Sequence, residues 1–134
     1  MAANTYGVTH ATLQDWFPQA IRFAEAARID STLVTSWITR LSEDVRAALY
    51  QHHPNDEEIT AASAPIAYAW LANTLAVGVA AKVGELAAES DPATVEAWRN
   101  EYATRLERLT RWPKTVLGDL STFRSTGWTV SLDR

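Results

Sequence analysis

Residues 29–49 have the sequence IDSTLVTSWITRLSEDVRAAL, in which apolar side chains recur at steps of three and four residues. That spacing places them on one stripe of an α-helix, with the polar side chains on the opposite face. Asp30 or Ser31 can cap the start of this helix, and Pro54 ends it because proline interrupts the hydrogen-bond ladder. We therefore predict an amphipathic helix with its stripe against the core. The stripe consists of Leu33, Val34, Trp37, Ile38, Leu41, Val45, Ala48 and Leu49.

Prolines and cap residues also divide the chain on either side of this helix. Upstream, Thr9 or Thr12 can cap a short helix with the sequence ATLQDWF, which Pro18 interrupts or restarts. Downstream, the next helix begins with the acidic residues 56–58, which suit the positive end of a helix dipole. We expect a break or kink at Pro65, and a main helical run from there to residue 88.

The sequence ESDPATVEAW, residues 89–98, gives the strongest boundary signal, with Asp91 at the cap and Pro92 at the first helical position. An apolar stripe follows up to Pro113 and consists of Val95, Trp98, Tyr102, Leu106, Leu109 and Trp112. After Gly118 the helical period is lost, and WTVSL alternates in the manner of a short strand. We predict an all-α fold, in which residues 1–117 form a small helical bundle domain and residues 118–134 an extended C-terminal docking tail. This tail can add a β-strand to a partner.

Composition limits the classes of protein that fit. The 134 residues suit one domain, and the absence of cysteine excludes disulfides and thiolate chemistry. A net charge of −4 argues against general binding to duplex DNA, which needs clustered cations. The N-terminus MAANTYGVTH lacks the features of a signal peptide. The uncharged run 61–81 is long enough to raise the question of a membrane span, but its alanines and missing basic flanks favour a buried central helix.

Two groups of charged or titratable residues are candidates for chemistry. His52 and His53, beside acidic residues 56–58, do not have the spacing of metal ligands, and we expect them to act at a helix end. The sequence also has no serine-nucleophile motif or phosphate loop, so we expect no enzymatic activity, catalytic residue, cofactor or metal. A basic strip lies near the end of the last helix: Arg105, Arg108, Arg111 and Lys114. It suits either DNA or an acidic partner, or a solvated face paired with Glu101 and Glu107, and we favour the solvated face.

The order of these segments resembles the small head–tail connector proteins of long-tailed bacteriophages, also called adaptor or head-completion proteins. The resemblance runs from IDSTLVTSWITRLSEDVRAAL through the alanine-rich APIAYAWLANTLAVGVAAKV to SDPATVEAWRNEYATRLERL. It covers roughly residues 29–109. The positions that match the family pattern are Trp37, Ile38, Ser42, Val45, Leu49, Trp98, Tyr102, Leu106 and Leu109. The opening ATLQDWF departs from the family's usual start.

The resemblance implies a structural virion protein that is not an enzyme. Such a protein forms a ring on the portal protein, matching the portal's twelve-fold symmetry, and binds the next neck or tail protein. The ring extends the channel through which DNA passes as cargo, and no membrane is involved. Its location is the head–tail interface of the virion, and the host cytoplasm during assembly. The basic strip would face the channel or the portal.

The tail would dock on a partner through alternating side chains, with Trp128 and Val130 on one side of a strand. Ring assembly would place Trp16 at a subunit contact, whereas we expect Trp37, Trp70 and Trp98 in the core. The residues predicted to dock are Phe123, Trp128, Val130, Leu132 and Trp16.

Other interpretations remain open at this point. The tail can instead cover its own bundle, with Trp128 in the core. The whole chain can also be a cytoplasmic helical protein-binding module or regulator, or a metal carrier or enzyme built around His52 and His53.

Overall fold

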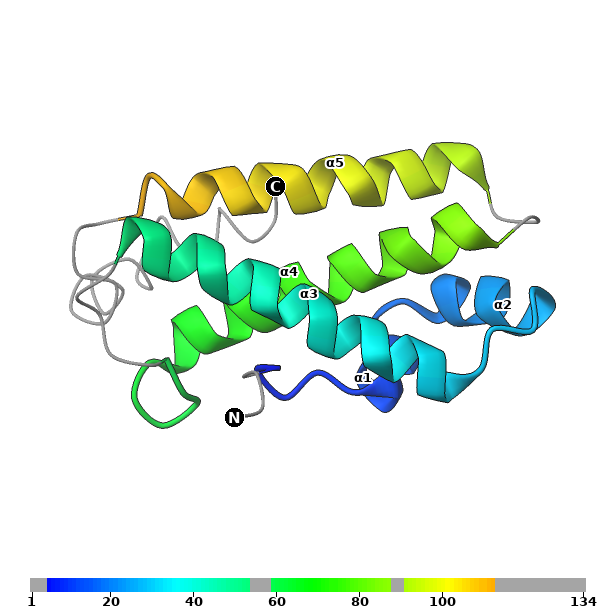
Figure 1. The fold of residues 1–134 in the computed structure, drawn as a ribbon, viewed down its shortest axis with the longest axis horizontal. Helices are drawn as coiled ribbons and strands as arrows, with labels where there is room; N and C mark the ends of the chain where they lie inside the picture. Colours follow the sequence, from blue (N-terminus) through cyan, green and yellow to red (C-terminus); the bar gives the residue numbers. More distant parts are fainter. Residues whose placement is uncertain (1–4, 54–58, 88–90, 113–134) are drawn as a thin grey trace.

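The computed structural model describes residues 5–53, 59–87 and 91–112, and within these ranges the chain forms five α-helices and no strand (Figure 1). The predicted all-α bundle is confirmed for this part of the chain. The boundary predicted at residue 118 and the whole tail lie outside the described residues. The helices are α1 (His10–Trp16), α2 (Pro18–Ala26), α3 (Ser31–His52), α4 (Pro65–Leu86) and α5 (Pro92–Leu109).

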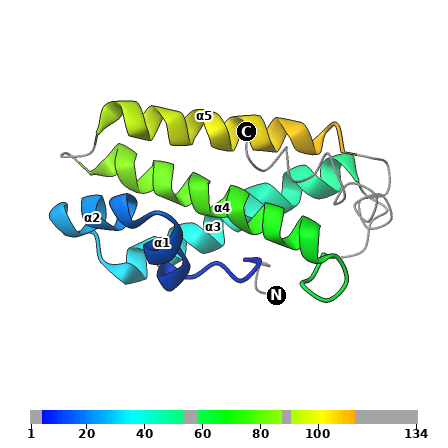
Figure 2. The ribbon, with the colours of Figure 1, turned by 180° about the vertical axis from the view of Figure 1, so that it is seen from behind.

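Helix α4 is the centre of the bundle and contacts each of the other four helices. In Figures 1 and 2, α5 runs along one side of α4 and the short helices α1 and α2 lie on the other. The α3 and α5 helices run in the direction opposite to α4. One end of the bundle therefore contains the end of α3, the start of α4 and the end of α5.

The burial of α4 decides whether its apolar sequence belongs to a membrane span or to a core helix. By length and composition, α4 is the one helix in the described ranges that could cross a membrane, with a mean hydropathy of 1.4 in its most apolar window. However, 72% of that window is buried inside the protein, as expected for a core helix. The prediction of a buried central helix is therefore confirmed.

The start of α4 differs from the sequence prediction. Pro65 is the first residue of the helix, and residues 59–64 form a turn instead of an earlier helical segment. In this turn the Thr60 amide donates to Ser63 Oγ at 3.0 Å, and the Ser63 amide donates to Thr60 Oγ1 at 3.1 Å. These side chains satisfy local backbone donors without a helix. The break at Pro65 is thus a helix start, whereas the predicted acidic start at residues 56–58 lies outside the described residues.

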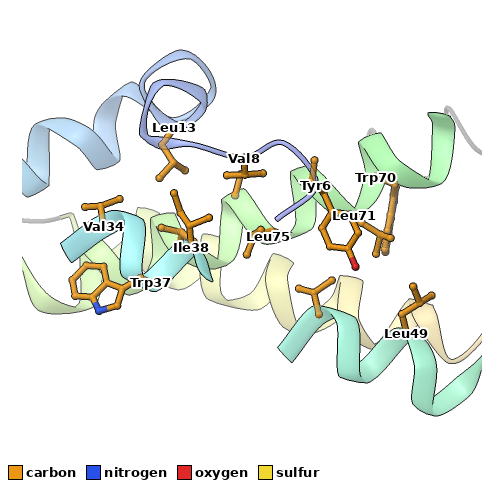
Figure 3. Close-up of a cluster of buried hydrophobic side chains, with 14 of the residues drawn as sticks. Tyr6, Val8, Leu13, Val34, Trp37, Ile38, Leu49, Trp70, Leu71 and Leu75 are labelled. Carbon is orange, nitrogen blue, oxygen red and sulfur yellow. The ribbon is translucent and has the colours of Figure 1, made fainter. Parts of the chain in front are cut away.

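The predicted stripe of α3 forms the main wall of the core. Asp30 caps the helix, accepting a hydrogen bond from the Leu33 amide at 2.9 Å. The stripe is buried at Val34, Trp37, Ile38, Val45 and Leu49. Figure 3 shows part of this wall meeting Leu13 of α1 and Leu75 of α4. Leu33 is an exception, with 44% of its surface exposed, because the first turn of α3 carries it outside the packed face.

Local capping explains the remaining helices. Thr9 and Thr12 form a reciprocal capping box at α1, and Pro18 opens α2 directly afterwards. At α5, Asp91 Oδ1 accepts from the Ala93 amide at 3.2 Å. That helix ends at Leu109, before the last position of the predicted stripe.

Candidate functional site

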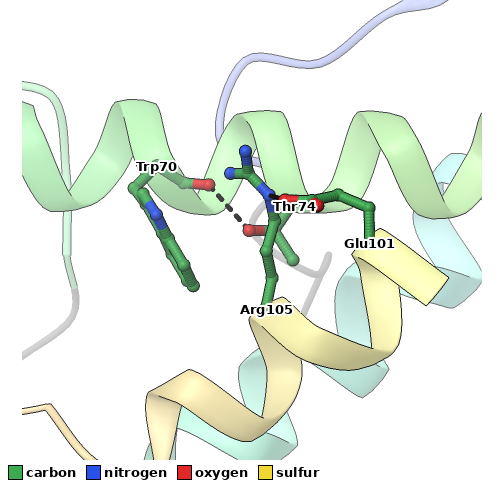
Figure 4. Close-up of polar contacts among 4 residues, drawn as sticks. All are labelled: Trp70, Thr74, Glu101 and Arg105. Carbon is green, nitrogen blue, oxygen red and sulfur yellow. Dashed lines mark hydrogen bonds and ion pairs between the residues drawn. The ribbon is translucent and has the colours of Figure 1, made fainter. Parts of the chain in front are cut away.

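The basic strip predicted on α5 does not form as one exposed surface. Arg105 is only 5% exposed, because it faces α4 on the same side of the helix as Tyr102 and Leu109, at spacings of three and four residues. Its Nε donates to Glu101 Oε2 at 2.6 Å, and its guanidinium lies 5.4 Å from the ring centroid of Trp70 (Figure 4). The prediction of Arg105 as an exposed member of the strip is therefore wrong.

The other members of the strip have different environments. Arg111 is 74% exposed and pairs with Glu107 at 3.5 Å, whereas Arg108 is half-buried. Lys114 lies outside the described residues. The predicted pairing of the strip with Glu101 and Glu107 is confirmed for Arg105 and Arg111. The surface cations of α5 are thus Arg108 and Arg99, which pairs with Glu85 of α4, and Arg111 follows two residues after the helix ends.

Aromatic rings gather where α5 ends. The ring centroids of Trp70 and Trp112 are 4.9 Å apart, and those of His53 and Trp112 are 6.3 Å apart. Arg105 lies over the Trp70 ring, and the rings connect the end of α3, α4 and the residues after α5. Such ring pairs contribute more to stability than the burial of their apolar area alone. The end of α5 is therefore held by long-range contacts.

His53 is the residue of this group whose role the sequence prediction missed. It is 3% exposed, and its Nε2 lies 2.7 Å from the carbonyl oxygen of Leu109. Since a carbonyl oxygen only accepts, Nε2 carries the hydrogen and donates it. The neighbouring His52 is exposed, so the two adjacent histidines have opposite environments. The predicted placement at a helix end is right, but His53 caps the end of α5 in addition to following α3.

Metal binding was the alternative interpretation of these histidines. Over residues 5–53, 59–87 and 91–112, no three His, Asp or Glu side chains come together in a way that could hold a metal ion. The acidic residues 56–58 lie outside these ranges. The described geometry instead gives His53 a hydrogen bond to the backbone.

Tyr102 occupies the seam between α4 and α5. Its ring lies against Gly78, and its hydroxyl is buried without a hydrogen-bond partner among the described residues. Burial, with a smaller contribution from the negative charge of Asp44, raises the pKa of Tyr102 to about 12. Both causes disfavour the phenolate. The side chain is therefore neutral at physiological pH.

The predicted docking residues fall into two groups. Trp16, at the end of α1, is 43% exposed, and its neighbour Phe17 packs edge-on against Trp98 of α5 with centroids 5.8 Å apart. Trp37 and Trp70 are buried as predicted, whereas Trp98 is half-buried. The tail residues predicted to dock lie outside the described residues: Phe123, Trp128, Val130 and Leu132.

No protein-family model, curated protein or solved structure matches the chain.

Proposed function

We propose that this protein is a structural component of the neck of a long-tailed bacteriophage. In this proposal it forms an adaptor ring between the portal and the tail-side neck proteins, and the ring extends the DNA channel. One observation carries the proposal. The α3 positions that define the resemblance to head–tail connectors are all buried in the bundle: Trp37, Ile38, Ser42, Val45 and Leu49. The resemblance therefore follows the packed face of the helix.

The arrangement of the next two helices gives further support. An alanine-rich helix, α4, lies at the centre of the bundle, and α5 packs along it with Leu109 fully buried. On α5 the other matching positions are half-buried: Trp98, Tyr102 and Leu106. This order of helices supports the proposal.

Self-association into a ring needs surfaces that the monomer leaves exposed. Trp16 is such a residue, and tryptophan is enriched in protein interfaces relative to the rest of the surface. We assign it to the contact between neighbouring subunits. DNA is passing cargo in the channel, which fits a net charge of −4 because strong retention of DNA needs clustered cations.

The tail, residues 118–134, is the proposed arm that docks on the portal or on a neighbouring subunit. As a strand, the segment WTVSL would put Trp128 and Val130 on one side and Thr129 and Ser131 on the other. A strand added to a sheet edge gains affinity from backbone hydrogen bonds and specificity from alternate side chains. Phe123 and Leu132 extend the apolar character of the same arm.

The experiment is electron microscopy of the purified protein with and without its candidate portal, together with measurement of binding to the portal. We expect the full chain to form a ring on the portal and a chain ending at Gly118 to lose it. Two double variants test the predicted alternation of side chains along the tail. Trp128→Ser with Val130→Ser should weaken binding to the portal, whereas Thr129→Ala with Ser131→Ala should not.

The opposite result has a clear meaning. If neither the full chain nor the shortened chain binds the portal or forms a ring, the adaptor proposal fails. The protein is then better described as a helical module that binds another kind of protein in the cytoplasm.

A further inference from the structure

We draw no further inference here: the strongest candidate, the exposed apolar side chains of Trp16 at the end of α1, Leu33 in the first turn of α3 and Leu86 at the end of α4, carries none because nothing in the described residues shows what covers them.

Discussion

Gly78 of α4 and Tyr102 of α5 touch so closely that a Cβ atom on the glycine would lie 2.6 Å from both Cδ1 and Cε1 of the tyrosine ring. Gly84, six residues further along α4, shows the same relation to Val95. The two glycines therefore mark a seam along which α5 approaches the backbone of α4. The small residues of α4 are therefore needed at these positions because larger side chains would collide with α5.

Gly78→Ala should lower the free energy of unfolding by about 1–2 kcal/mol, because the displaced ring costs more than the gain in helix propensity. Urea unfolding measures this change. Ala69→Gly, at an exposed position of the same helix, is the control for backbone propensity alone and should cost about 1 kcal/mol. Adding Tyr102→Leu to Gly78→Ala should recover part of the loss. A Gly78→Ala variant more stable than the parent would show that the ring moves aside freely.

Arg105→Ala should cost about 2–3 kcal/mol, because it removes the contact with Trp70 and leaves Glu101 without its partner. Arg111→Ala breaks an exposed pair and should change stability by at most about 0.5 kcal/mol. Replacing the buried pair by apolar residues, Arg105→Met with Glu101→Leu, should come within about 1 kcal/mol of the parent. Thermal unfolding of the three variants tests these values. Equal effects of Arg105→Ala and Arg111→Ala would contradict the buried position of Arg105.

Tyr102 should make stability depend on pH in the alkaline range. Its pKa is about 12 in the folded protein against 10.0 for an ordinary tyrosine, so the folded state favours the neutral phenol. This contribution is fully present below pH 10 and is lost as the pH rises through about 12, because the unfolded chain ionises first. Tyr102→Phe should remove this decline, seen as the difference between urea unfolding curves at pH 9 and pH 12. Tyr50→Phe, on α3, should keep it. A decline of the same size in the Tyr102→Phe variant would exclude Tyr102 as the cause.

Trp16→Ser should leave the bundle folded, with a change in unfolding free energy below about 1 kcal/mol, because much of this side chain is already exposed. If Trp16 lies between subunits, as we propose, the same substitution should reduce the assembled fraction measured by light scattering on the portal. Leu86→Ser, an exposed apolar position at the end of α4, is the control. Normal ring formation by Trp16→Ser would remove Trp16 from the subunit contact.

The sequence was most informative where local chemistry decides the structure. The cap at Asp30, the start at Pro92 and the stripe of α3 follow from spacing and side-chain hydrogen bonds within a few residues. The turn of residues 60–63 was missed because its two hydroxyl side chains satisfy backbone donors that a helix would otherwise use.

The candidate site was harder to predict because its contacts are long-range. A step of three along α5 placed Arg105 with Arg108, but the position of α4 decides which face of α5 is buried. The bond of His53 joins residues 56 apart, and nothing in the repeated pair HH indicates which histidine turns inward. Periodicity shows which residues of a helix share a face. Packing against other helices decides which of those faces is buried, even when it carries a charged side chain.

The contact between Trp70 and Trp112 also has an optical consequence. Their ring centroids are 4.9 Å apart with an angle of 58° between the ring planes, so the electronic transitions of the two indoles interact. Circular dichroism of such a pair depends on the relative orientation of the rings, and it would change when Trp112 moves away. The protein thus contains its own spectroscopic reporter for the end of α5, and subtraction of the Trp112→Phe spectrum would isolate its signal without any added label.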